Sequence, residues 1–189
     1  MTDTLMHRVP EAELSESLKA ARASALALTG DATITEVFAN SPKVCEFFFE
    51  GFYKGLFFSG DVAIRYKELL RLRLSKVHGC WFCNRNNEAG AKAAGFDDAQ
   101  IQAIGGDGEA DFSGTERAVL ALADELVLTN MGGTLTPELY ADLKAHFTDG
   151  EIVELAMVGA VLGGLNKMAF VLNLVERETW CPFSPAEAA

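Results

Sequence analysis

The stretch KELLRLRLSKVHGCWFCNRNN, residues 67–87, decides the interpretation of this chain. Its first half repeats apolar residues at helical spacing and stops at Gly79, since glycine commonly closes a helix. A new helix is then expected over residues 81–94. Cys80 and Cys83 therefore stand where this second helix begins. The stretch predicts two helices joined by a tight turn that carries a CxxC dithiol.

Helical periodicity continues through most of the chain. Further helices are predicted over residues 11–28, 42–58, 62–76, 113–128, 137–147 and 152–176. Their starts carry N-cap signals, namely Ser41 before Pro42, Asp61, Ser113 with Glu116 as a capping box, and Thr136 before Pro137. Strand-like alternation never lasts more than a few residues, and no linker divides the chain. We therefore expect an all-α fold in which residues 1–189 form a single domain.

Two of the predicted long helices share a faint pattern. RYKELLRLRLSKVHG, residues 65–79, and EIVELAMVGAVLGG, residues 151–164, each carry a Glu-Leu pair about one turn in. Each also follows an aspartate, Asp61 or Asp149. The pattern suggests a duplicated helical hairpin.

The composition favours a globular protein that binds neither nucleic acid nor an anionic membrane. The 189 residues are 49% apolar and 23% charged, with a formal net charge of −11, and polyanions repel an acidic protein. The N-terminal stretch MTDTLMHRVPEAELSESLKAA lacks a basic region followed by an apolar one, so no signal peptide is predicted. Glu154, Asn166 and Lys167 interrupt the apolar residues 152–175, which favours a core helix over a membrane span. We predict a cytoplasmic protein whose cysteines are reduced at rest.

Three other kinds of site compete with a helical redox dithiol. Zinc needs about four ligands, and the chain has no second CxxC or paired histidines, although His78, Cys45 or Cys181 could be recruited in space. A thioredoxin-like site would follow a strand, and two buried thiols without function are the third alternative. A redox dithiol is favoured, because a helix N-terminus stabilises a thiolate and the spacing lets Cys80 and Cys83 close a disulfide.

The residues around the dithiol resemble a known family. ELLRLRLSKVHGCWFCNRNNEAGAKAAGF, residues 68–96, is similar to the core motif of the carboxymuconolactone decarboxylase-like superfamily, on its alkylhydroperoxidase (AhpD-like) branch. That motif has a glutamate before a CxxC, a helix after it, and small residues ending in glycine and an apolar residue. The resemblance is close over residues 61–104. It implies an AhpD-like helical fold, thiol-dependent peroxide reduction without haem, flavin or metal, and a homo-oligomer, commonly a trimer or hexamer.

The resemblance also assigns roles to three residues. It implies that Cys83 is the peroxidatic thiol, which a peroxide oxidises to a sulfenic acid. Cys80 would be the resolving thiol and proton donor, and Glu68 would be the acid of a proton relay. The helix position alone would favour Cys80 as nucleophile, since the first cysteine of a CxxC is usually the more exposed one. We follow the family assignment.

The chain departs from the family at the end of the opening stretch. The family pattern is CxxCxxxH, often with a second histidine just before the last one, and here Asn87 and Asn86 occupy these places. An amide does not titrate, so it can orient a water or a thiolate but cannot accept the thiol proton. Glu68 acting through water, or His78 two residues before Cys80, could replace the histidine. A histidine at a helix end is more commonly solvated or a cap.

Three further features carry expectations. The dense aromatic run of residues 47–58 should in part face a partner subunit or a ligand cavity. The GxxxG spacing at residues 159–163 permits close helix packing. The basic residues Arg71, Arg73 and Lys76 are expected on a solvated helix face, with thiolate activation or attraction of an anionic substrate as the alternative.

The leading hypothesis is a cytoplasmic AhpD-like peroxidase that reduces an organic peroxide at Cys83. It would then close the Cys80–Cys83 disulfide and be re-reduced by an external dithiol. One alternative is a lactone decarboxylase of the carboxymuconolactone type, whose chemistry needs no dithiol. The other is a non-catalytic oligomeric binding or redox-sensing protein that lost turnover together with the family histidine.

Overall fold

The computed structural model describes residues 3–106 and 109–183, which form helices joined by turns and contain no strand. In chain order the elements are the 3-10 helix η1 (Glu11–Glu13), α1 (Glu16–Thr29), α2 (Thr33–Phe38), α3 (Pro42–Cys45), the π-helix η2 (Glu46–Phe57), α4 (Ile64–His78), α5 (Trp81–Ala93), α6 (Asp98–Gly105), α7 (Gly114–Glu125), α8 (Pro137–Lys144) and α9 (Asp149–Val171). The predicted all-α class is confirmed.

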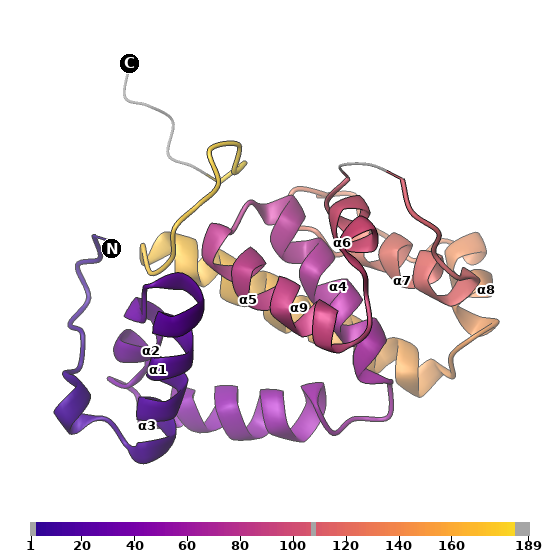
Figure 1. The fold of residues 1–189 in the computed structure, drawn as a ribbon. Helices are drawn as coiled ribbons and strands as arrows, with labels where there is room; N and C mark the ends of the chain where they lie inside the picture. The colour runs from indigo at the N-terminus through magenta and orange to yellow at the C-terminus, as the bar shows by residue number, and fades with distance from the viewer. Residues whose placement is uncertain (1–2, 107–108, 184–189) are drawn as a thin grey trace.

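Helix α4 is at the centre of the fold and contacts α5, α6, α7 and α9 (Figure 1). Four of its leucines have no exposed surface, namely Leu69, Leu70, Leu72 and Leu74. They point to different sides of the helix, so α4 is surrounded by neighbours and not laid on the surface. In Figure 1, helices α1, α2 and α3 gather at one end of the molecule, and η2 runs along its lower edge towards α4.

The turn between α4 and α5 depends on a glycine. Gly79 follows the last residue of α4 and has a φ of +65°, in the left-handed region that favours glycine. A Cβ at this position would also lie 2.6 Å from the Cα of Cys181. The predicted break at Gly79 is therefore confirmed, for a conformational and a packing reason. A second copy of this hairpin, around α9, stays a prediction.

Most of the predicted caps are confirmed. Ser41, Ser113 and Thr136 each accept a backbone N–H in the first turn of α3, α7 and α8, respectively. Ser113 and Glu116 form the expected capping box. Local sequence therefore decides where these helices begin.

The cap predicted at Asp61 is wrong. Helix α4 begins at Ile64, and the carboxylate of Glu154 in α9 accepts the backbone N–H groups of Asp61 and Val62 at 2.9 and 3.1 Å. Glu154 also lies 2.5 Å from the amino group of Lys67, which has no exposed surface. A carboxylate from a distant helix thus replaces the local cap and neutralises a buried cation.

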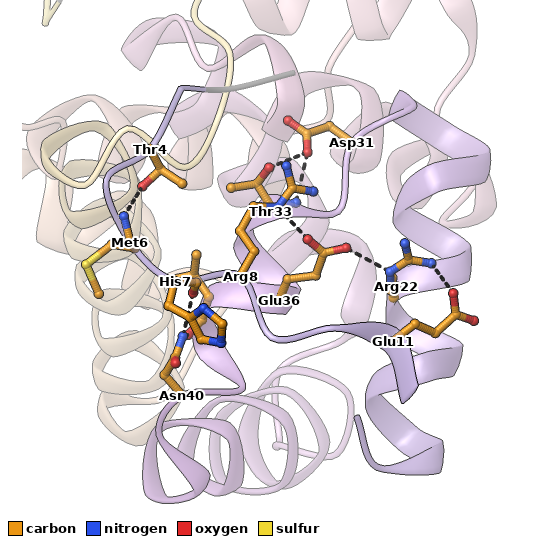
Figure 2. Close-up of polar contacts among 11 residues, drawn as sticks. Thr4, Met6, His7, Arg8, Glu11, Arg22, Asp31, Thr33, Glu36 and Asn40 are labelled. Atoms are coloured by element: carbon orange, nitrogen blue, oxygen red, sulfur yellow. Dashed lines mark hydrogen bonds and ion pairs between the residues drawn. The ribbon is translucent and has the colours of Figure 1, made fainter. Parts of the chain in front are cut away.

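The buried carboxylate of Glu36 connects the segment before α1 to helices α1 and α2. Glu36 of α2 accepts hydrogen bonds from Arg8 at 2.5 Å and from Arg22 at 2.8 Å, and Figure 2 shows it between the two side chains. Arg22 also pairs with Glu11. Because two guanidinium groups share it, Glu36 keeps its charge compensated although it is buried. These contacts hold α1 and α2 where they form one wall of a cavity.

Helix α9 is long and apolar enough, by length and composition alone, to cross a membrane. One face of it packs against α4. The approach to its neighbours is close at Gly159, where a Cβ would lie 2.6 Å from the Cδ1 atom of Leu126. Along this face α9 packs as the core helix that the sequence predicted. The outer face of α9 exposes Val153, Met157 and Val171.

Candidate active site

The dithiol occupies the turn between α4 and α5 and is joined as a disulfide. Cys80 is the N-cap residue of α5, and its sulfur accepts the backbone N–H of Cys83 at 3.2 Å. The two Cα atoms lie 5.2 Å apart, as a disulfide requires. Cys80 has no exposed surface, whereas Cys83 is partly exposed and lines a cavity. The expectation from helix position, that Cys80 is the more exposed thiol, is therefore wrong.

The cavity beside Cys83 has a volume of about 290 Å³ and mostly apolar walls. Residues of α1, α2, η2, α4, α5 and α9 line it, and its aromatic side chains are Phe48, Phe49, Tyr53 and Phe82. The expectation that part of the aromatic run faces a ligand cavity is confirmed for the first three. Phe52 and Phe57 of the same run lie in the core, and Phe47 and Phe58 are exposed.

Asn166 of α9 connects Cys83 to His78. Its amide oxygen is placed 3.3 Å from the sulfur of Cys83, and its amide nitrogen 3.2 Å from Nδ1 of His78. The side chain also lines the cavity. In the sequence Asn166 stands out only as a polar interruption of an apolar helix. That interruption is the signal that could have identified it, since a polar side chain on the buried side of a helix needs a partner.

His78 is fully buried at the C-terminus of α4. Its Nε2 atom accepts the backbone N–H of Leu128 at 3.0 Å. Burial lowers the pKa of His78 from 6.5 to about 4, because the charged ring would lose its hydration. The expectation of a solvated or capping histidine is therefore wrong. His78 is connected to Cys83 through the side chain of Asn166, which lies between them.

Glu68 is buried against α5 together with Arg71. The Nη2 atom of Arg71 lies 2.5 Å from Oε2 of Glu68. Burial raises the pKa of Glu68, and the guanidinium of Arg71 opposes that rise. A Cβ at Gly90 would lie 2.6 Å from the same Glu68 oxygen, so the ion pair fits because α5 has a glycine there. Arg71, and not Glu68, lines the cavity.

The basic residues near the dithiol have different surroundings. Arg73 pairs with Asp124, and Lys76 pairs with Glu88. Arg71 instead shares the cavity with Cys83, so the prediction of a solvated helix face is wrong for this residue. A guanidinium beside a thiol favours the thiolate.

The two asparagines that replace the family histidines both line the cavity. Asn86 donates to the backbone oxygen of Phe82 at 2.9 Å. Asn87 is buried and donates to the backbone oxygen of Arg71 at 3.4 Å. Their amide N–H groups are thus directed to the backbone, and their contribution to the cavity is its shape and polarity.

The remaining cysteines do not line the cavity. The thiol of Cys45 donates to the backbone oxygen of Phe38 at 3.2 Å, and the thiol of Cys181 donates to that of His78 at 3.1 Å. Over the described residues 3–106 and 109–183, no group of three or more His, Cys, Asp or Glu side chains is placed to hold a metal ion.

Residues 47–125, which include the dithiol, match the family model of the Carboxymuconolactone decarboxylase family. A relative in Bacillus subtilis (strain 168), the uncharacterized protein YdfG, is 25% identical over 108 residues. The matched region is 57% of this chain and 73% of that protein.

Solved structures with the same fold extend the comparison to nearly the whole chain. The debrominase Bmp8 in its apo form superposes with a TM-score of 0.72 at 18% identity, covering 94% of both chains. A cysteine-to-alanine variant of Bmp8 in complex with 2,3,4-tribromopyrrole gives a TM-score of 0.71 at 18% identity, covering 94% of this chain and 93% of that one. The alkylhydroperoxidase AhpD core of an uncharacterized peroxidase-related protein from Ralstonia eutropha JMP134 gives 0.70 at 18% identity, covering 92% of both chains.

The matched segment, the dithiol and the shared fold agree with the resemblance stated from the sequence. Residues 47–125 carry the match to the Carboxymuconolactone decarboxylase family, and the chain has the helical fold of the AhpD core. Both were predicted from residues 61–104.

Proposed function

We propose that the protein is a thiol-dependent peroxidase that reduces organic hydroperoxides with the Cys80–Cys83 dithiol. The unequal placement of the two sulfurs carries this proposal. Cys83 lines an apolar cavity, while Cys80 is buried and bonded to it. One sulfur can therefore meet a substrate, and the other can close on the product. The apolar walls favour a hydroperoxide with a hydrocarbon body over hydrogen peroxide.

The first chemical step oxidises Cys83. Its thiolate attacks the terminal oxygen of the hydroperoxide, the O–O bond breaks, and the sulfur becomes a sulfenic acid. The alkoxide that leaves takes a proton and departs as an alcohol. In the second step the sulfur of Cys80 attacks Cys83, the S–S bond forms, and the hydroxyl leaves with the proton of Cys80 as water. An external dithiol then supplies two electrons and two protons and reopens the disulfide.

Two features of the site support a thiolate at Cys83. The residue lies in the first turn of α5, where the helix dipole favours negative charge. The guanidinium of Arg71 lines the same cavity. The backbone N–H of Cys83, which faces the sulfur of Cys80, stabilises charge on Cys80 when it attacks.

Glu68 acts in this proposal by holding Arg71. The ion pair fixes the guanidinium where it lines the cavity, so Glu68 influences Cys83 through Arg71. This role differs from the proton relay that the resemblance implies. Asn87 cannot replace a titrating histidine, and the proton for the alkoxide comes from water.

The experiment is steady-state reduction of cumene hydroperoxide with dithiothreitol as the electron donor. We expect turnover by the native protein and its loss in Cys83→Ser and in Cys80→Ser. Cys45→Ser is the matched control, because this half-buried thiol does not line the cavity, and it should keep the native rate. Peroxide turnover in a variant without both Cys80 and Cys83 would contradict the proposal.

The same variants separate the alternatives. Decarboxylation of a carboxymuconolactone-type lactone that survives replacement of Cys80 and Cys83 would favour the lactone decarboxylase. A dithiol that is oxidised once, without turnover in the presence of dithiothreitol, would favour a redox sensor.

A second candidate is reductive debromination of a small aromatic compound. Bmp8, a debrominase, has the same fold, and four aromatic side chains line the cavity with Cys83. The dithiol would again supply two electrons: the C–Br bond is replaced by C–H, bromide leaves, and the disulfide forms. Bromide release from 2,3,4-tribromopyrrole that is lost in Cys83→Ser would support this reaction. The absence of release from a protein that consumes hydroperoxide would exclude it for that compound.

We also propose that the protein forms a cytoplasmic homo-oligomer, a trimer or a hexamer. Apolar side chains on η2 and α9 are exposed in a single copy, among them Phe47, Met157 and Val171. A second copy of the chain is the proposed occupant of this surface. Light scattering should give the mass of several chains, and Met157→Glu should shift it to smaller species. A native mass equal to one chain would contradict the proposal.

A further inference from the structure

The hydrogen bonds of His78 determine which of its ring nitrogens carries the hydrogen. Leu128 donates its backbone N–H to Nε2 at 3.0 Å, so Nε2 presents a lone pair and carries no hydrogen. The ring is therefore neutral, and its single N–H is on Nδ1. Nδ1 lies 3.2 Å from the side-chain amide of Asn166. As Nδ1 is a donor, the atom of Asn166 that faces it must be an acceptor.

The amide of Asn166 meets this requirement in one orientation. With its nitrogen towards His78 and its oxygen towards Cys83, two donors would meet at Nδ1. The oxygen would also face, at 3.3 Å, a disulfide sulfur that has no hydrogen to share. Turning the amide by 180° exchanges two atoms of nearly equal size and pairs each donor with an acceptor. Nδ1–H then donates to the amide oxygen, and the amide N–H donates to the sulfur.

We propose that Asn166 is a catalytic residue that donates its amide N–H to the sulfur of Cys83, in an orientation imposed by His78. The inference rests on the proposed reaction at Cys83. A hydrogen bond donated to the reduced sulfur stabilises the thiolate over the thiol. His78 acts through Asn166 as a positioning residue and contributes without gaining or losing a proton. A donor from α9 thus assists the thiolate of a site in which the family histidine is an asparagine.

Few other groups could produce the same effect at Cys83. The titratable or charged side chains that line its cavity are Arg71 of α4 and Tyr53 of η2. Among the described residues no Asp or Glu lines the cavity, and Cys80 is its disulfide partner. Arg71 acts by its charge, whereas Asn166 is within hydrogen-bonding distance of the sulfur itself.

The test is the thiol pKa of Cys83 in the reduced protein. It is obtained from the pH dependence of alkylation by iodoacetamide, followed by mass spectrometry of the peptide that contains Cys83. No peroxide enters the assay, so its outcome does not depend on whether the protein turns over hydroperoxides. Failure of this inference and failure of the proposed function can therefore be told apart.

Loss of the amide donor should raise this pKa. In Asn166→Leu we expect an increase of about one to two units, a roughly 10- to 100-fold smaller thiolate fraction below the pKa. Asn166→Asp should raise it further, because a carboxylate still accepts from His78 but presents negative charge to the sulfur. Asn84→Leu is the matched control: Asn84 is also buried, in α5, but its amide donates to Glu178, and the pKa of Cys83 should not change.

The opposite orientation of the amide predicts the opposite sign. An oxygen that accepts from the S–H group would favour the thiol, so Asn166→Leu would lower the pKa of Cys83. A decrease or no change would overturn the proposal. If Asn166→Leu does not fold by circular dichroism, Asn166→Ala, which removes the amide without adding charge, carries the test. His78→Phe, which removes the Nδ1–H donor, should raise the pKa part of the way, whereas a merely structural role for His78 would leave it unchanged.

Discussion

The burial of His78 makes a quantitative prediction for stability in acid. Its ring has no exposed surface, and its pKa in the folded protein is lowered from 6.5 to about 4. Well above pH 6.5 the ring is neutral in both the folded and the unfolded chain, and this group does not make stability depend on pH. As the pH falls from 6.5 towards 4, the unfolded chain binds a proton that the folded protein does not. The free energy of unfolding then decreases by about 1.4 kcal/mol per pH unit, or about 3 kcal/mol in total.

His78→Gln isolates this contribution. Urea denaturation from about pH 8 to about pH 4 gives the free energy of unfolding of both proteins, and groups that titrate in both cancel in the difference. We expect the native protein to lose about 3 kcal/mol more than the variant, with the excess confined to the acidic half of the range. His146→Gln, at an exposed position, is the control and should follow the native curve. Parallel curves for the native protein and His78→Gln would refute the reasoning, because His78 would then be protonated in the folded state.

Three other changes test the packing and the site. Glu154→Gln leaves the buried Lys67 without its charge partner and should lower the free energy of unfolding, measured by urea denaturation, by about 3–5 kcal/mol. Adding Lys67→Met should recover most of this loss. Equal losses in the single and double variants would show that the ion pair is not the cause. Gly159→Ala should cost about 1–3 kcal/mol because its Cβ meets Leu126, whereas Gly164→Ala, with open space around its Cβ, should cost nothing. Asn87→His should speed the oxidation of Cys83 by cumene hydroperoxide in stopped-flow experiments and add a titration step near neutral pH, since histidine can accept the thiol proton; an unchanged rate would show that proton transfer to this position is not limiting.

Local signals were sufficient for most of the fold. Ser113 with Glu116 and Ser41 with Pro42 cap helices as expected, because a cap depends on the few residues beside it. Gly79 ends α4 for the same kind of reason. The start of α4 could not be predicted in this way. Glu154 supplies the acceptor at that point, and its distance in sequence from Asp61 hides the contact.

The π-helical form of η2 was not predicted either. Its residues, 46–57, carry aromatic side chains at a spacing that indicated an ordinary helix. In an α-helix each N–H bonds to the fourth preceding residue, and in a π-helix it bonds to the fifth. Where most side chains are apolar, the hydrophobic periodicity cannot distinguish the two forms.

Only the part of the site that depends on residues close together in the sequence could be predicted. The junction of α4 and α5 places Cys80 and Cys83 as their spacing requires. Their exposure is set by other elements, since α9 and η2 contribute the cavity that Cys83 lines. The contact between Cys83 and Asn166 joins residues 83 positions apart in sequence, so no local sequence pattern predicts it. The burial of His78 depends on the segment around Leu128 in the same way.

The central claim is that Cys83 is the sulfur that reacts with the hydroperoxide and that Cys80 resolves the product. The most direct measurement traps the sulfenic acid in single-cysteine variants of the dithiol. Reduced Cys80→Ser and Cys83→Ser are each treated with one equivalent of cumene hydroperoxide in the presence of dimedone, and the adducts are located by mass spectrometry. The account predicts an adduct on Cys83 in Cys80→Ser and none on Cys80 in Cys83→Ser. An adduct on Cys80, or an unmodified Cys83, would contradict it.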